Sequence, residues 1–391
     1  MDGRSGDRGA ALATLLVAVG AAWSVGNVGA VVGDLSSEFD LSLATVGLIS
    51  GTLLLGFSVP GTLLSPLIGE RFGIARTMVA AVLLGTAGSL LFALSPGIGG
   101  LLAGRAMAGF ALGAVVVVGP VFARATGGVG RVALFGAGIQ LGIAGGLGVG
   151  AALGDAGVDW RFTFLISAAV VLSPLPLLLR RDEIRYERGG GTGFVRIALR
   201  SSRVWRLGSL FLAVFAVPLI LGSWLVHYLS VDNGLAAATA GALSFLMFGV
   251  SAAARQVGGR LAERDFSRVL LVSGAPFLAA AGLVVLALDD SLGFAVVAVL
   301  ACGIGFAVPY GIGVVQAQSL YPTEPTEPVA FVTLIGTAVP IPLVPLIGSL
   351  LDDGYGAEVF LGLAAIVAFA GLLNLRPVAG SLEPDAAPAP A

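Results

Sequence analysis

Residues 69–76 read Gly69-Glu70-Arg71-Phe72-Gly73-Ile74-Ala75-Arg76, a short charged turn between two long apolar runs. A related turn, Ala262-Glu263-Arg264-Asp265-Phe266-Ser267-Arg268, follows another apolar run, and its Glu263 stands 193 positions after Glu70. That offset is about half of the 391-residue chain, which indicates an internal duplication. Two more pairs recur at offsets of 196 and 197: Gly109-Phe110-Ala111 with Gly305-Phe306-Ala307, and Gly154-Asp155-Ala156-Gly157 with Leu351-Asp352-Asp353-Gly354.

The composition is that of a protein in lipid. Hydrophobic residues make up 57% of the chain and charged residues only 11%, with a mean hydropathy of +0.99. A soluble domain carries about 25% charged residues, so this much apolar surface needs a bilayer around it. All 21 basic residues are Arg.

Twelve apolar runs are long enough to cross a bilayer as helices. The sequence therefore predicts an all-α membrane protein with about twelve transmembrane helices in two pseudo-symmetric six-helix bundles. The expected units are an N-terminal bundle (1–180), a cytoplasmic linker (181–203), a C-terminal bundle (204–376) and a disordered tail (377–391). The predicted spans are 9–33, 43–68, 77–95, 98–123, 131–154, 161–180, 204–230, 237–258, 269–288, 292–319, 329–351 and 357–376.

Charge along the chain predicts the orientation in the membrane. If the N-terminus is inside and the helices alternate, the Arg residues other than Arg105 and Arg161 fall in or beside the inner segments. The outer segments hold Arg161 and eleven of the 23 acidic residues. Because cytoplasmic segments are enriched in basic residues, we expect both termini on the cytoplasmic side of the plasma membrane.

At the duplicated turn the chain resembles the major facilitator superfamily, and the resemblance covers essentially the whole length. That family carries G-x-L-x-D-R-x-G-R-R after its second helix. Here Pro66 replaces the first Gly, Glu replaces Asp, and the last Arg is displaced by one. The resemblance implies a charged conformational latch at the cytoplasmic face, whereas an ordinary positively charged inner loop is the alternative. The latch residues would be Glu70, Arg71, Gly73 and Arg76 in the first half, with Glu263, Arg264 and Arg268 in the second.

Two other stretches are similar to the same family. Residues 105–113 match R-x-x-x-G-x-x-x-G of its fourth helix, and residues 160–164 match W-R-x-x-F at the start of its sixth helix. Span five carries Gly138, Gly142, Gly146 and Gly150 on one helix face, a pattern that permits close helix packing. The family's antiporter motif has G-P in that helix, but Ile143 follows Gly142, which weakens an antiport mechanism.

Arg105 is the most informative residue for function. It lies about 10 Å inside span four, and a charge within the membrane is costly and normally faces the protein interior or a cavity. The equivalent position in the second half is Ala301, so the charge is not a shared scaffold feature. The structural alternative is that Arg105 binds backbone carbonyls without touching solute.

In the resembled fold, helices one, four, seven and ten line the central path. Polar or aromatic residues on those spans are therefore candidates for substrate binding or coupling. His227 is a candidate proton carrier, although an interfacial or packed role is the alternative. Gln140 on span five either joins the site or bonds a neighbouring helix. The set is Arg105, Asn27, Gln140, Trp224, His227, Tyr228 and Tyr310.

These features predict a secondary active transporter that works by alternating access on a small solute. Arg105 and the absence of Asp or Glu well inside any span favour a small anion. A multidrug or metabolite efflux permease of the same fold is the alternative within the class. A non-transporting membrane sensor is the alternative from another class. The general pattern is similar to cyanate/nitrate-type permeases, without a motif specific for substrate.

The chain lacks the residues that other classes of function require. Without Lys the chain has no Walker-type ATP-binding loop, and one His with no acid at membrane depth argues against an intramembrane enzyme. We expect no enzymatic activity, no cofactor, no bound metal and no nucleic-acid partner. The expected partners are the solute, a coupling ion such as the proton, and the lipid bilayer, with the chain acting as a monomer.

Overall fold

The computed structural model describes residues 3–58, 68–69, 71–181, 198–264, 266–321 and 326–376, and these residues form helices and no strand. Eleven helices are each long and apolar enough to cross a membrane. A twelfth span is counted if α2 and α3, which meet at a bend of 120°, act as one. The prediction of an all-α membrane fold with about twelve spans is thereby confirmed.

The N-terminal half, up to residue 181, contains seven described helices. Its longest helix, α6, comprises two spans that turn at Gly127 and Gly128. Gly128 has φ +66°, a conformation that a residue with a Cβ adopts only at a cost, so glycine suits this turn. The helices are α1 (Gly3–Gly26), α2 (Val32–Phe39), α3 (Leu43–Gly56), α5 (Ile74–Ala93), α6 (Ile98–Asp155), α7 (Arg161–Leu172) and α8 (Leu175–Leu178).

The C-terminal half, from residue 198, has a π-helical turn in two of its spans, inside the span Ser202–Val231 and at the start of the span Leu270–Leu288. In each case a proline follows at the start of the next α-helix, Pro218 in one and Pro276 in the other. Proline lacks an N–H and crowds the carbonyl four residues before it, so the wider turn relieves the ladder there. The elements are α10 (Ser202–Phe211), η2 (Leu212–Ala216), α11 (Val217–Val231), α12 (Ala237–Glu263), η3 (Leu270–Gly274), α13 (Ala275–Leu288), α14 (Leu292–Leu320), α15 (Thr326–Ala338), α16 (Pro340–Asp352) and α17 (Gly356–Leu373).

Most predicted spans agree with these helices within a few residues, but the first does not. It was expected to run to residue 33, whereas α1 ends at Gly26 and turns occupy the next residues. Val28 and Val31 in those turns are fully buried by the protein, so their apolar character does not mark a helix. The end of predicted span two, the linker residues 182–197 and the tail 377–391 lie outside the described residues, so the domain boundaries stay predictions.

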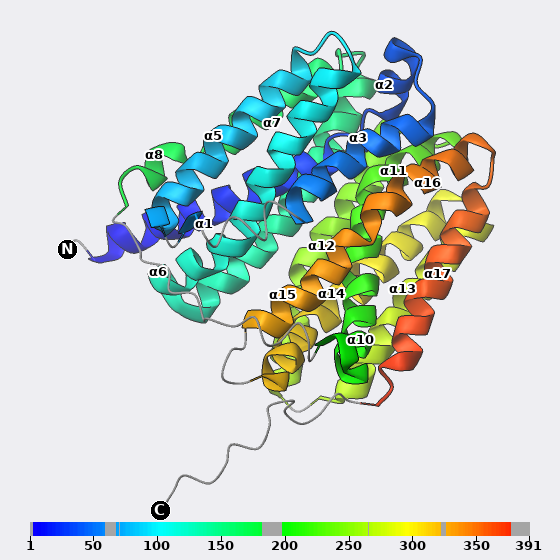
Figure 1. The fold of residues 1–391 in the computed structure, drawn as a ribbon. Helices are drawn as coiled ribbons and strands as arrows, with labels where there is room; N and C mark the ends of the chain where they lie inside the picture. The colour runs from blue at the N-terminus through cyan, green and yellow to red at the C-terminus, as the bar shows by residue number, and fades with distance from the viewer. Residues whose placement is uncertain are drawn as a thin grey trace, which may run out of the picture.

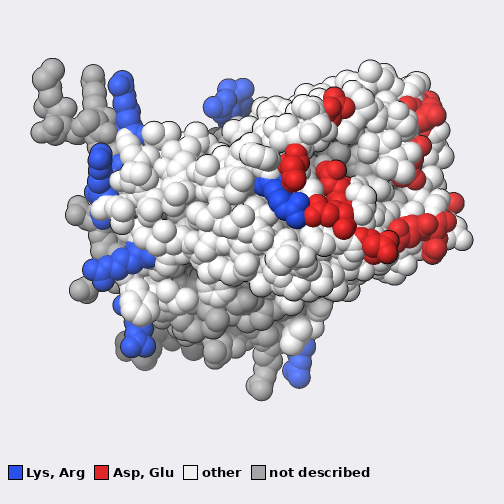
Figure 2. All heavy atoms as spheres, turned by 90° about the horizontal axis from the view of Figure 1, so that it is seen from above, with Lys and Arg blue, Asp and Glu red and all other residues white. Residues whose placement is uncertain are grey.

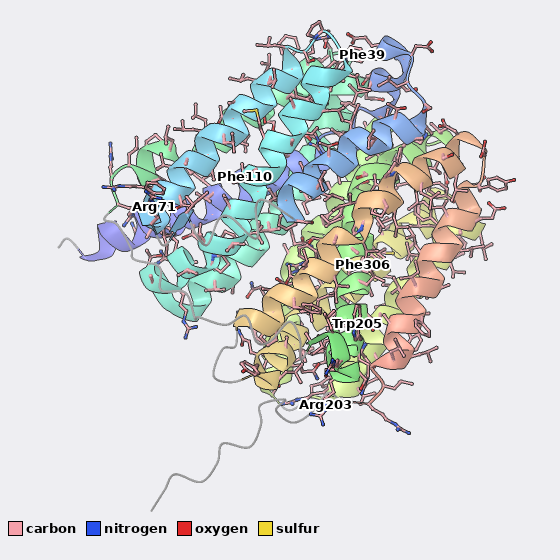
Figure 3. The ribbon with its side chains drawn as sticks, in the orientation of Figure 1. Phe39, Arg71, Phe110, Arg203, Trp205 and Phe306 are labelled. Atoms are coloured by element: carbon pink, nitrogen blue, oxygen red, sulfur yellow. The ribbon has the colours of Figure 1, made fainter. Side chains whose placement is uncertain are left out.

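The two halves lie side by side (Figure 1). They approach one another where α3, α11 and α16 are labelled, and α3 packs on α16 there. Figure 3 places Phe110 and Phe306, the central residues of one duplicated motif, part-way along their respective halves. This placement agrees with the repeat that the sequence predicts.

Charged side chains separate along the molecule (Figure 2). Acidic residues gather at one end and most Arg residues on the visible face lie toward the other. In Figure 3 Arg71 and Arg203 lie away from Phe39, the residue that follows Glu38 in the chain. We name the acidic end by Asp34, Glu38, Asp159, Asp232, Asp352, Asp353 and Glu358, and the Arg-rich end by Arg71, Arg76, Arg203, Arg264 and Arg268.

One basic residue belongs to the acidic end. Arg161 pairs with Glu38 through two hydrogen bonds of 3.0 and 2.5 Å, and the Trp160 indole N–H donates to the same carboxylate at 2.5 Å. The Arg161 guanidinium, and then the indole, hold the pKa of Glu38 below its usual value. Trp160 also packs edge-on to Phe92 and Phe164, so this cluster fixes α2 against the start of α7.

The glycine face of α6 packs closely against another helix, as the sequence predicts, and the structure shows that this helix is α1. Each of Gly138, Gly142, Gly146 and Gly150 faces residues of α1 or the turn after it. A Cβ on Gly146 would lie 2.5 Å from the Trp23 carbonyl oxygen, which is backbone and cannot move aside. The two helix backbones therefore touch at these positions, and no larger residue fits between them.

We expect Gly146→Ala to destabilise the protein by about 1 to 3 kcal/mol, because the methyl group would overpack the helix contact. The thermal midpoint of the detergent-solubilised protein measures this change. Gly136→Ala on the same helix is the matched control, since a Cβ there meets nothing within 4 Å. Equal midpoints for the two variants would contradict the backbone contact.

Candidate functional site

Arg105 lies inside the N-terminal half with only 2% of its surface exposed. Its Nη1 donates to the Ser24 carbonyl oxygen at 2.5 Å and to Asn27 Oδ1 at 3.0 Å, both at the end of α1. Its Nε is buried without a hydrogen-bond partner. The guanidinium is thus held by neutral acceptors only and keeps an unsatisfied donor, which is unusual for a buried group.

A polar chain continues from Arg105 across the N-terminal half. The Asn27 amide donates to Ser167 Oγ on α7 at 3.4 Å, and Ser167 Oγ lies 3.3 Å from Ser89 Oγ on α5. Four helices therefore meet in one network, which we name the Arg105 network. Its members contain no carboxylate, and the only acids within the described spans stand at or near span ends: Asp155, Asp352 and Glu358.

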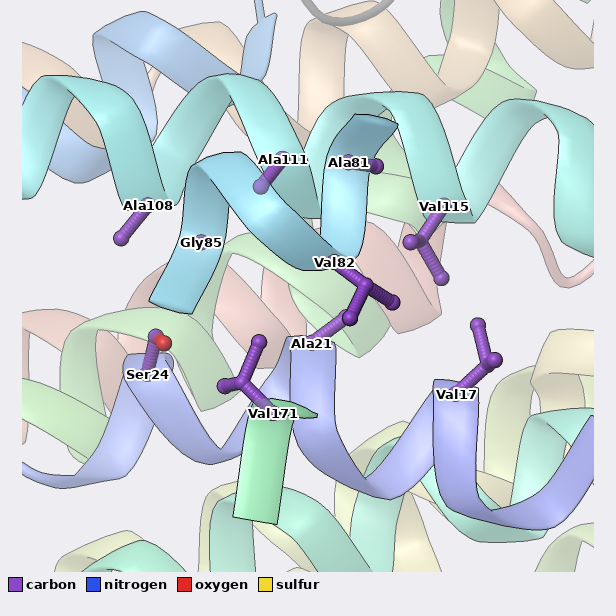
Figure 4. A pocket seen from close by; sticks show the side chains of 10 residues that line it. All are labelled: Val17, Ala21, Ser24, Ala81, Val82, Gly85, Ala108, Ala111, Val115 and Val171. Carbon is purple, nitrogen blue, oxygen red and sulfur yellow. The ribbon is translucent and has the colours of Figure 1, made fainter. Parts of the chain in front are cut away.

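A small cavity lies beside the Arg105 network (Figure 4). Side chains from α1, α5, α6 and α7 line it, and Ser24 is the polar member of a lining that is otherwise apolar. Its size admits about one water molecule. No solute larger than water reaches Arg105 through this cavity in the present conformation. Among the described residues no group of three or more His, Cys, Asp or Glu side chains is placed to hold a metal ion.

The three candidates on span seven separate into two roles. The Trp224 indole N–H donates to the Val344 carbonyl at 3.1 Å, and the Tyr228 hydroxyl donates to the Leu286 carbonyl at 2.9 Å. Both side chains are buried among helices of the C-terminal half. His227 is partly exposed, and its ring centre lies 6.1 Å from that of Trp224. Partial exposure thus distinguishes His227 from its two buried neighbours.

Tyr310 lies beside a charge that the sequence analysis did not single out. The guanidinium carbon of Arg255, on α12, lies 4.1 Å from the Tyr310 ring centre. Arg255 stands seven residues before the end of a span, about 10 Å inside it. An Arg inside an apolar run was present in the sequence, but the orientation argument counted Arg255 with the charges of the adjacent inner turn. Gln140, the remaining candidate, is 4% exposed on the second span of α6.

The structure describes only some residues of the latch motif. Gly73 has φ +89° where α5 begins, which explains a glycine at that position of the motif. Arg71 lies over the Phe72 ring at 5.6 Å, and Arg264 and Arg268 are exposed at the Arg-rich end. Glu70 and the Glu263 side chain lie outside the described residues, so an ionic latch stays a prediction.

The two halves contact one another directly at the acidic end. The carboxylate of Asp352, at the end of α16, accepts hydrogen bonds from the Leu43 and Ala44 backbone N–H groups at 3.1 and 3.3 Å. These groups open α3, so a side chain of the C-terminal half caps a helix of the N-terminal half. Gly47 extends the contact, because a Cβ there would lie 2.7 Å from Pro345 Cα. Toward the Arg-rich end, the Gln256 amide of the C-terminal half donates to the Ala133 carbonyl of the N-terminal half at 3.0 Å. We call this interface between the two halves the seam.

Comparison with known proteins places the chain in a family. The sequence profile of the Major Facilitator Superfamily matches residues 14–341, and the chain belongs to this superfamily. It is a secondary transporter of the alternating-access type, as the twelve-span fold and its two halves imply. No curated protein matches significantly.

Solved transporters share the fold over nearly their whole length. A bacterial homolog of the human lysosomal transporter Spinster, inward-facing and unoccupied, has a TM-score of 0.75 at 15% identity, covering 95% of this chain and 96% of that one. The xylose transporter XylE from E. coli, inward open, has a TM-score of 0.75 at 13% identity, with 94% and 95% covered. The nucleoside transporter NupG has a TM-score of 0.72 at 12% identity, with 93% and 98% covered. At these identities the likeness concerns the fold alone.

We expect Asp352→Ala to loosen the contact between the halves at the acidic end. Loss of a helix cap costs about 1 kcal/mol, which corresponds to an approximately fivefold shift toward the separated arrangement. Electron–electron distance measurements between spin labels at positions 40 and 355, in a Cys302→Ser background, report it. Asp353→Ala is the matched control, since no hydrogen bond to α3 involves that neighbouring exposed residue. Identical distance distributions for both variants would exclude a gating role for Asp352.

Proposed function

We propose that this transporter moves a small anionic solute across the plasma membrane. The observation that carries the proposal is the sign of charge at membrane depth. Arg105 and Arg255 lie about 10 Å inside their spans, whereas acids in the described spans stand only at or near the ends. A cation without a fixed counterion in a medium of low dielectric constant attracts an anion and repels a cation.

Arg105 supplies this potential from inside the N-terminal half. Its acceptors, the Ser24 carbonyl and the Asn27 amide, are neutral and leave its charge uncompensated. Asn27 stands where α1 ends, and Gly29 two residues later packs against the Gly222 carbonyl of the C-terminal half. The Arg105 network therefore lies close to the seam, and a change in the seam alters its environment. We assign Arg105 and Asn27 to the solute or coupling site, together with Gln140, Trp224, His227, Tyr228 and Tyr310.

The orientation forms part of the proposal. Placing the Arg-rich end in the cytoplasm follows the bias of basic residues toward that side, and it puts both termini there. Closure of the halves at the acidic end by Asp352 and Gly47 is then closure toward the outside. Similarity to transporters solved in inward-facing and inward-open states supports the same conformation for this chain.

A proton is the proposed coupling ion, and the monomer is the proposed functional unit. One similar solved protein is a D-xylose–proton symporter, with a TM-score of 0.76 at 14% identity. In this chain His227 is the only imidazole, and it lies near Asp352 at the closed end. An imidazole changes charge near neutral pH, so it suits a carrier that loads protons from that side.

Uptake into proteoliposomes tests the anion proposal. We expect uptake of at least one anion from a panel of nitrate, cyanate, lactate and benzoate, with little uptake of xylose, uridine or ethidium. Arg105→Gln removes the buried charge and is expected to lower anion uptake by about 10-fold to 100-fold. Arg8→Gln, at an exposed residue where the first span begins, is the control with the same substitution and is expected to transport normally.

The outcomes separate the alternatives. Uptake of neutral or cationic solutes without anion uptake would replace the anion proposal with the efflux-permease alternative. Unchanged uptake by Arg105→Gln would remove Arg105 from the mechanism. Binding of panel anions without any uptake would favour the sensor.

Coupling has its own test in the same vesicles. We expect an inwardly directed proton gradient to raise the initial uptake rate, and a protonophore to abolish the increase. His227→Ala is expected to lose the stimulation by the gradient while keeping exchange of solute for solute, because only the coupled step needs the proton. Stimulation that survives in His227→Ala would assign proton carriage to another group, and no stimulation of the unsubstituted protein would indicate uniport.

A further inference from the structure

Arg255 differs from Arg105 in what holds it. Its guanidinium carbon lies 4.1 Å from the Tyr310 ring centre, and its Nε is buried without a hydrogen-bond partner. No carboxylate or carbonyl of the described residues accepts a hydrogen bond from it. The π face of Tyr310 is therefore the only partner of this charge within the described chain.

An arginine in a membrane normally directs donors to carbonyls or acids, as Arg105 does through the Nη1 that donates to the Ser24 carbonyl. A guanidinium has five N–H donors, and leaving them without acceptors at membrane depth is costly. The Arg255 side chain is partly exposed, so donors not covered by Tyr310 remain within reach of a ligand. The arrangement is that of a binding group whose acceptor arrives from outside the protein.

Aromatic rings continue from Tyr310 across the seam. The Phe215 ring is roughly parallel to the Tyr310 ring at 6.3 Å, and the Phe57 ring of α3 follows at 6.4 Å. Phe57 belongs to the N-terminal half and the other two rings to the C-terminal half. Gln256, next to Arg255, bonds Ala133 of the N-terminal half at 3.0 Å. The guanidinium thus stands beside an apolar row to which both halves contribute.

We propose that Arg255 and Tyr310 bind the carboxylate of an organic anion with a flat apolar body, such as an aromatic carboxylate. The guanidinium, steadied on one side by Tyr310, offers its remaining N–H groups to the two carboxylate oxygens. The apolar body lies along the partly exposed Phe215 ring, behind which the buried Phe57 ring of the N-terminal half packs. Because Arg255 is near the Arg-rich end, the anion arrives from that end. This assignment deepens the proposed function and rests on it for the direction of movement, but binding itself is independent of transport.

Equilibrium binding to the purified full-length protein tests the site by calorimetric titration. Benzoate is the probe, benzamide is its neutral analogue, and acetate is the same charge without the ring. We expect benzoate to bind at least about 10-fold more tightly than either analogue. Arg255→Gln is expected to weaken benzoate binding by about 10-fold to 100-fold, as for loss of a charge-assisted hydrogen-bonded pair.

Variants around Arg255 separate its role from a general loss of charge or fold. Tyr310→Phe keeps the ring and is expected to retain benzoate affinity within about threefold, whereas Tyr310→Leu loses the π face and weakens binding. Arg260→Gln, an exposed position on the same helix, is the matched control and is expected to bind as the unsubstituted protein does. Size-exclusion profiles and thermal midpoints show whether each variant is folded.

Three results would overturn the proposal: no benzoate binding by the unsubstituted protein, equal affinity for benzamide, or unchanged affinity in folded Arg255→Gln. Benzoate binding that depends on Arg255 but is not accompanied by uptake would sustain this site and refute the transport proposal. Uptake of other anions without benzoate binding would refute this site and sustain the transport proposal.

Discussion

Direct contact between helix backbones at glycine positions is the interaction on which the rest of this structure depends. In lipid there is no hydrophobic driving force for helices to associate, so van der Waals packing must hold them together. The glycine face of α6 lets α1 approach closely, and that approach brings Ser24 and Asn27 to the Arg105 guanidinium. Gly47 of the N-terminal half makes the same kind of close contact with Pro345 of the C-terminal half. Glycine therefore permits close backbone packing both within a bundle and at the seam.

Two cations lie at membrane depth in this scaffold, one buried and one partly exposed, and they are accommodated differently. Arg105 is immobilised by neutral acceptors from α1, which keep its geometry fixed without cancelling its charge. Arg255 rests on an aromatic ring, which stabilises the charge from one side and leaves the other side open. Under the proposed function, Arg105 would supply a fixed positive potential deep in one half and Arg255 a binding group at the edge of the other. Neither guanidinium has a carboxylate as a hydrogen-bond partner among the described residues.

The sequence predicts the fold well because its signals are local. Apolar run length locates the spans, and four-residue glycine spacing identifies the face of α6 that meets α1. The sequence predicts the site less well, because tertiary packing decides which acceptor each polar side chain bonds. Nothing local reveals that the Trp224 and Tyr228 polar atoms satisfy carbonyls inside their own half. Arg255 was overlooked because the predicted span ended three residues after it, at 258, whereas the helix continues to Glu263 and places the charge deeper in the span.

The carboxylate of Asp352 at the start of α3 gives the closed end a particular mechanical character. When the two halves part, a carboxylate and a pair of helix-end amides are both easily hydrated, so neither is stranded in an unfavourable environment. An ion pair of two side chains would also leave a cation in need of solvent. This contact can therefore form and break at small energetic cost, because both of its partners are readily hydrated once they separate.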